Sequence, residues 1–146
     1  MTRAHDIEPR FPVEMPLKVQ AYDIDVVGIV SNISYVRWLE ELRQAWCDTH
    51  YPTDRMFAQG FVPAIGLTHI EYKRAILFGE RVLGRIWFEG FRGQRWNFGF
   101  EFVVVDRVAA VARQSGIFIA LADRTIRQIP DDMLERFGKR PESGVD

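Results

Sequence analysis

Hydrophobic side chains between residues 35 and 46 recur at the spacing of one face of an α-helix. They follow one another at intervals of 3, 1, 3 and 4 residues: Tyr35, Trp38, Leu39, Leu42 and Trp46. This spacing places them on a single apolar stripe. Three residues suited to cap a helix, Ser31, Asn32 and Ser34, precede the stripe, and Pro52 follows it. The pattern predicts one amphipathic helix over about 33–49.

Much of the remaining chain alternates between apolar and polar residues with the period of two that is typical of β-strands. Between residues 95 and 106, four aromatic side chains occupy alternate positions and must share one face: Trp96, Phe98, Phe100 and Phe102. Further strands are predicted at 17–22, 61–74, 81–91 and 111–121, with a hairpin turn at 92–94. Residues 1–15 read as an irregular arm, and 130–137 as one or two helical turns in a charged tail.

The order of these elements is one strand, one long helix and then four strands joined by short connections. An aromatic sheet face needs a cover, and the long helix is the element available for it. We therefore expect an α+β fold, in which a curved antiparallel sheet of about five strands wraps around a central helix. One domain is expected over 1–146, with its core at about 16–121. Exposed sheet edges favour a homodimer or a dimer of dimers.

Composition narrows the functional classes. The chain has 146 residues, with 19 Lys and Arg against 20 Asp and Glu. This balance argues against a nucleic-acid binder, which normally carries a basic excess. No apolar run approaches the ~20 residues needed to cross a membrane, and no signal-peptide pattern opens the chain. We expect a soluble, cytoplasmic protein without a membrane association.

Cysteine and histidine are too sparse to form a metal centre. Cys47 is the one cysteine, which excludes an internal disulfide, and the three histidines His5, His50 and His69 lack the spacing of metal ligands. We expect Cys47 to be a small buried residue and His69 a structural residue rather than a general base. The sequence predicts neither a metal nor a bound cofactor.

The segment from Tyr22 to Tyr35, YDIDVVGIVSNISY, carries the most specific signal, and Trp38, Glu40 and Arg43 continue it. This segment resembles the signature of the hot-dog-fold acyl-CoA thioesterases of the 4-hydroxybenzoyl-CoA thioesterase type. In that family an Asp precedes a Gly by three residues, just before the central helix. The resemblance implies hydrolysis of an acyl-CoA thioester to the free acid and CoA, with CoA present as part of the substrate.

The resemblance selects Asp25, three residues before Gly28, as nucleophile or general base, and the sequence leaves these two roles open. Backbone N–H groups around 32–34 at the positive end of the helix dipole are suited to polarise the thioester carbonyl. Gly28 permits the tight turn between them. Asp23 is expected to hydrogen-bond the turn instead.

Four further residues of the motif have weaker assignments. Asn32 is a candidate catalytic residue that orients substrate or water, and it is equally a candidate helix N-cap. Ser34 and Tyr35 join Gly28 as candidate substrate-binding residues, although the apolar stripe also makes Tyr35 a core residue. Ile29 stands where one branch of the family has a histidine, which leaves Asp25 without that partner. Glu40 lies nearly opposite the stripe and is expected to be solvated or at an interface.

Charge is distributed unevenly along the chain. Residues 71–95 hold six basic and three acidic side chains, a surplus that would attract the phosphates of CoA. The resemblance assigns this contact to Arg92 and Arg95, which flank the predicted hairpin turn. Two alternatives stay open: a thioesterase for acyl-carrier-protein substrates, and a non-catalytic acyl-CoA-binding regulatory module. The acyl group, aromatic or aliphatic, is not fixed by the sequence.

Overall fold

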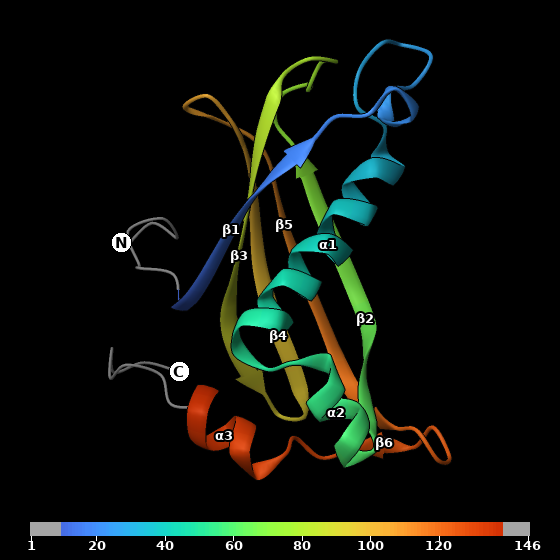
Figure 1. Cartoon of the computed structure of the whole chain (residues 1–146), viewed down its shortest axis with the longest axis vertical. Coiled ribbons are helices and arrows are strands. Elements are labelled where there is room, and N and C mark those ends of the chain that lie inside the picture. Colours follow the sequence, from blue (N-terminus) through green and yellow to red (C-terminus); the bar gives the residue numbers. More distant parts are fainter. Residues whose placement is uncertain (1–9, 139–146) are drawn as a thin grey trace.

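The computed structural model describes residues 10–138. A six-stranded antiparallel sheet curves around the long helix α1 (Asn32–His50), and its main strand order is β1-β3-β4-β5-β2. These strands are β1 (Arg10–Lys18), β2 (Phe61–Tyr72), β3 (Arg81–Arg92), β4 (Arg95–Val104) and β5 (Arg107–Ala120). The short β6 (Ile126–Arg127) pairs with β5. Figure 1 shows α1 lying along one face of this sheet.

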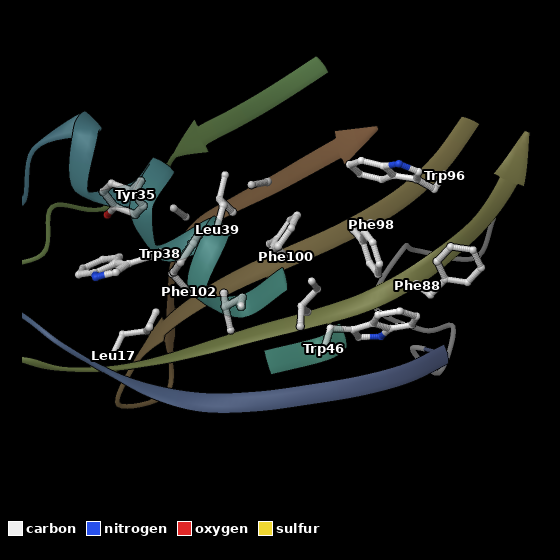
Figure 2. Close-up of a cluster of buried hydrophobic side chains, with 14 of the residues drawn as sticks. Leu17, Tyr35, Trp38, Leu39, Trp46, Phe88, Trp96, Phe98, Phe100 and Phe102 are labelled. Carbon is white, nitrogen blue, oxygen red and sulfur yellow. The ribbon is translucent and has the colours of Figure 1, made fainter. Parts of the chain in front are cut away.

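The two faces meet in an aromatic core, as the sequence predicts. All five residues of the helical stripe are buried, and so are the four alternating aromatic residues of β4. Figure 2 shows Tyr35, Trp38, Leu39 and Trp46 of α1 in one cluster with the four aromatic residues of β4. Tyr35 packs edge-on against Phe102 with ring centroids 5.2 Å apart, and Trp46 meets Phe98 at 4.8 Å. Such pairs add to the stabilisation from burial alone.

A glycine in β3 allows α1 to approach the sheet closely. A Cβ atom at Gly84 would lie 2.7 Å from Leu17 Cδ1 and 3.0 Å from Leu42 Cδ1. The contact with Leu17 is too short, and that with Leu42 is tight, so both side chains would have to shift. The spacing between α1 and the sheet therefore depends on this missing side chain.

Three smaller elements differ from the sequence prediction. The first strand begins at Arg10 and not at Leu17, so the part of the predicted irregular arm from residue 10 onward is wrong; residues 1–9 lie outside the described part of the chain. Residues 21–23 form a 3₁₀ turn (η2, Ala21–Asp23) instead of the end of a strand. A short helix, α2 (Thr53–Gln59), was not predicted, whereas the predicted helical turns near the C-terminus are present as α3 (Asp131–Phe137).

Edge position explains why β1 was missed. Pro12 and Pro16 interrupt its sequence pattern. Proline has no backbone N–H, but it is tolerated on an edge strand because N–H groups on the outer side of that strand have no neighbouring strand to bond. Phe11, Val13 and Met15 alternate along this strand and pack against the core. The alternation was therefore present in the sequence but was masked by the prolines.

The strand β2 forms the other edge, and it is unusually exposed. Along its 12 residues, Ile65, Leu67 and Tyr72 are 45%, 56% and 48% exposed. On α1, Ile33 and Val36 are also exposed, at 66% and 47%. A long edge strand that carries apolar side chains is a template for pairing with another strand.

Candidate functional site

Asp25 lies on a tight turn that leads into α1. Its backbone N–H donates to Ile29 O at 2.9 Å, and Gly28 N–H donates back to Asp25 O at 3.0 Å. Gly28 has φ +89°, a conformation that L side chains rarely adopt, and it closes this turn. The adjoining Val30 N–H donates to Ile76 O at 2.8 Å, which ties the turn to the segment after β2.

The two oxygens of the Asp25 carboxylate differ. Oδ1 accepts hydrogen bonds from the backbone N–H groups of Val27 at 2.9 Å and Ile29 at 3.4 Å. For Oδ2 the part of the chain that the structure describes provides no hydrogen-bond partner. The side chain is half-buried. One oxygen therefore fixes the orientation of the carboxylate, and the other remains available to a substrate or a water molecule.

Asp23, in contrast, is a structural residue, as the sequence predicts. It is 3% exposed, and its Oδ2 accepts from Gln20 N–H at 2.8 Å while Oδ1 accepts from Ser34 Oγ at 2.7 Å. Its backbone oxygen accepts from Ser31 N–H at 2.8 Å. Asp23 and the buried Ser34 thus hold the Asp25 turn against the first turn of α1.

The start of α1 corrects one alternative for Asn32. Ser31 is the N-cap residue. Asn32 is the first residue of the helix, and its side chain is exposed. Ser34 N–H donates to Ser31 O at 3.1 Å, so it is not a free donor as the sequence analysis expected. Among residues 10–138 no partner is found for the N–H groups of Asn32 and Ile33. These two N–H groups, at the positive end of a 19-residue helix, are suited to bind a developing negative charge.

A cavity of about 290 Å³ lies at this end of α1. Ile29, Asn32 and Tyr35 line one side, and the segment from Tyr72 to Ile76 lines the other. Asp25 is linked to the cavity wall through the hydrogen bond from its backbone N–H to the oxygen of Ile29. Tyr35 is 2% exposed and packs edge-on against Tyr72, so it is both a core residue and part of the cavity wall. Burial, with a smaller contribution from Tyr72, raises the pKa of Tyr35 to about 12, so its hydroxyl stays protonated at neutral pH.

In the folded chain, Arg92 and Arg95 lie near the opposite end of α1 from Asp25. Their hairpin connects β3 and β4 near α3, where Gln94 Oε1 accepts from Ile129 N–H at 2.9 Å (Figure 1). The Arg95 guanidinium lies beside Gly66 in the middle of β2. Within one chain, the structure therefore does not bring these two arginines to the Asp25 turn.

A second, smaller cavity of about 50 Å³ lies near the C-terminal half of α1. Its lining is apolar apart from Arg43 and Cys47. Arg43 donates to Oε1 of the buried Gln114 at 2.6 Å, and Gln114 in turn donates to Thr68 Oγ1 at 3.0 Å. Burial lowers the pKa of Arg43 and raises that of Cys47 to about 11.

Sequence reasoning missed this polar chain. The available signal was the alternation of β5, which places Gln114 on the same face as the buried Ala112 and Phe118. A glutamine at an inward position of a strand needs a hydrogen-bonding partner. Arg43 on α1, the last residue of the motif, supplies it.

Other candidate residues of the sequence analysis lie in exposed positions. The side chain of Glu40 is 68% exposed and lies 3.9 Å from Arg43. His69 is 59% exposed and lies 3.6 Å from Glu71. Within residues 10–138 there is no group of three or more His, Cys, Asp or Glu side chains arranged to hold a metal ion. None of the helices in this range is long and apolar enough to cross a membrane.

Comparison with known proteins places the chain among thioesterase-like proteins. Residues 19–137 match a family model described as the thioesterase-like superfamily. A relative from Aquifex aeolicus (strain VF5), which carries the name "Putative esterase", is 26% identical over 119 residues. The match covers 81% of this chain and 91% of that relative.

Solved structures share the fold at low sequence identity. DHNA-CoA thioesterase from Staphylococcus aureus superposes with a TM-score of 0.75 at 18% identity, covering 86% of this chain and 82% of that chain. A mutant of 4-hydroxybenzoyl-CoA thioesterase, complexed with 4-hydroxybenzoyl-CoA, gives 0.77 at 15% identity and covers 86% and 97%. The curved sheet around a central helix is thus the hot-dog fold that the sequence predicts.

Proposed function

Because this chain belongs to the thioesterase-like superfamily, we propose that it hydrolyses an acyl-CoA thioester to the free acid and CoA. The observation that supports this most is the turn before α1. It presents one carboxylate oxygen of Asp25 close in the chain to the N–H donors of Asn32 and Ile33, and none of these three groups has a hydrogen-bond partner within residues 10–138. A nucleophile or base and an oxyanion-binding pair are the two elements that thioester hydrolysis requires.

Two routes use this arrangement. In one, Asp25 Oδ2 attacks the thioester carbon, the C–S bond breaks, and water then hydrolyses the mixed anhydride. In the other, Asp25 takes a proton from a water molecule that attacks the same carbon. Either way the carbonyl oxygen gains negative charge, and the N–H groups of Asn32 and Ile33 stabilise it. Thiols are acidic enough, with a pKa of ~8.5 for free cysteine, that a thiolate departs without a strong general acid.

The remaining motif residues support this centre in different ways. The Asn32 side chain lines the cavity and orients substrate or water, and Tyr35 forms part of the wall against which the substrate packs. Gly28 fixes the turn. Ser34 is 1% exposed and bonded to Asp23, so its contribution to substrate binding is to hold the turn in place. The contact of Arg92 and Arg95 with CoA stays a prediction.

A homodimer is part of the proposal. The edge strand β2 carries three exposed apolar side chains, Ile65, Leu67 and Tyr72, and Ile33 and Val36 on α1 are exposed as well. Pairing of β2 with the same strand of a second copy would satisfy its free backbone groups and bury these side chains. Two dimers that associate further would give the dimer of dimers.

The test is thiol release from short-chain, long-chain and aromatic acyl-CoAs, with an acyl-carrier protein as a parallel substrate. We expect turnover with at least one acyl-CoA, and the panel ranks the acyl groups. Turnover of the carrier-protein substrate alone would move the assignment to an acyl-carrier-protein thioesterase. Binding of acyl-CoA without turnover of any substrate would contradict hydrolysis and indicate a non-catalytic binding module.

A further inference from the structure

The cavity at the start of α1 has two basic side chains on the wall opposite Asn32. Lys73 and Arg74 directly follow β2 and line this cavity together with Tyr72. Both side chains are exposed. Both belong to the basic stretch of the sequence, but unlike Arg92 and Arg95 they lie at the same end of α1 as Asp25.

Among the described residues these two cations have no acidic partner. Within residues 10–138 no ion pair involves Lys73 or Arg74, and Glu80, the next carboxylate along the chain, pairs with Arg107. Glu71 lies 3.6 Å from His69, and Glu80 lies 3.8 Å from Arg107. Two adjacent positive charges beside a cavity therefore remain available to an anion.

The backbone that carries them is held in place. Lys73 N–H and Arg74 N–H both donate to Ala109 O, at 2.8 Å and 3.0 Å. The other wall of the cavity is fixed to the same segment through the bond from Val30 N–H to Ile76 O. An anion bound here would not have to order the loop first, which lowers the entropic cost of binding.

The size of the cavity limits what it accepts. A volume of about 290 Å³ corresponds to roughly ten water molecules at ~30 Å³ each. It has room for the reacting thioester and the start of its carrier arm. The thiol carriers of acyl thioesters, free CoA and the prosthetic arm of a carrier protein, both bear phosphate.

We propose that Lys73 and Arg74 bind the phosphate of the thiol carrier and so set the direction in which the leaving group lies. This inference rests on the proposed thioester hydrolysis and adds a binding site to it. It places the phosphate contact at the end of β2, and the hairpin arginines Arg92 and Arg95 are the matched alternative in the same chain.

The experiment compares two charge-removing double variants, Lys73→Gln with Arg74→Gln, and Arg92→Gln with Arg95→Gln. Each is assayed with an acyl-CoA, the same acyl group on a carrier protein, and the acyl-N-acetylcysteamine, which has no phosphate. We expect the first variant to raise KM for a phosphate-bearing substrate about tenfold with kcat unchanged, as loss of charge-assisted contacts would do. KM for acyl-N-acetylcysteamine should not change, and the hairpin variant should raise KM for the phosphate-bearing substrate less than the first variant does. The substrate whose KM rises identifies the carrier as free CoA or a protein.

Other results would overturn the proposal. An unchanged KM in the first variant with a raised KM in the hairpin variant would move the phosphate to Arg92 and Arg95. An equal rise for the phosphate-free substrate would show a structural effect. If wild type hydrolyses no thioester, the proposed function fails, and calorimetric binding of 3′,5′-ADP then tests the subsite alone. Binding that the first variant loses would support the site, and absence of binding to wild type would overturn it.

Discussion

Replacing Asp23 with alanine removes both hydrogen bonds of a buried carboxylate that holds the Asp25 turn on α1. Gln20 N–H, 2.8 Å from Oδ2, would lose its acceptor. Ser34 Oγ would lose the 2.7 Å bond but would keep Ser31 Oγ at 3.3 Å. Hydrogen bonds to a charged group contribute about 1.5–3 kcal/mol each. Because one donor keeps a partner, we expect a loss of about 3 kcal/mol in the free energy of unfolding.

The assay is urea unfolding of Asp23→Ala, Asp23→Asn and the matched control Asp106→Ala, whose side chain is exposed on the β4–β5 turn. The asparagine variant should lose only about 1 kcal/mol, because its amide can accept from Gln20 N–H and donate to Ser34 Oγ. The control should stay within ~0.5 kcal/mol of wild type. An Asp23→Ala midpoint equal to that of the control, at unchanged m-value, would refute the anchoring role.

Three further predictions address other parts of the structure. Burial raises the pKa of Cys47 to about 11. Its reaction with a disulfide reagent at pH 8 should therefore be roughly two orders of magnitude slower in the folded than in the urea-unfolded protein. Similar rates in the two states would contradict the burial of this thiol. The pKa of Tyr35, raised to about 12, exceeds the unfolded value of ~10, so its contribution to stability is complete below pH 10 and is lost as the pH rises from 10 to 12. Tyr35→Phe should reduce this loss in urea unfolding at pH 9 and 11, and an identical loss in both proteins would refute it. Leu67→Lys on the edge of β2 should convert a dimer to a monomer in light scattering, whereas the equally drastic Val105→Lys on an exposed turn should not; a monomeric wild type would overturn the dimer.

Local periodicity was sufficient to predict the elements that form the core. The helix predicted over 33–49 spans Asn32–His50, because its ends are set by the apolar stripe and by Pro52. The four aromatic residues of β4 alternate so strictly that their common face follows from strand geometry alone. In β5, by contrast, the strand begins at Arg107 and not at 111, because the connection to β4 is only the tight turn at Val105 and Asp106.

The candidate site was predictable only as far as it is local in sequence. Asp23, Asp25 and Gly28 lie within six residues, and the family resemblance, rather than this spacing, assigned the anchoring carboxylate to Asp23 and the available one to Asp25. The donors at the start of the helix were predicted around 32–34, but the pairing of Ser34 N–H with Ser31 O was not, because it depends on where the helix begins. The positions of Lys73 and Arg92 relative to Asp25 depend on the sheet topology, which places one at the near end of α1 and the other at the far end.

The most direct test of the central claim is the turnover number of Asp25→Asn, measured beside wild type and Asp106→Asn with the best acyl-CoA of the panel. The asparagine keeps an oxygen that can accept from Val27 N–H, so the turn should persist. We predict a loss of about two or more orders of magnitude in kcat for Asp25→Asn alone, while the affinity for a non-hydrolysable thioether analogue of the substrate stays within a few-fold of wild type. Full turnover in Asp25→Asn would contradict the proposed role of this carboxylate and, with it, the assignment of the site.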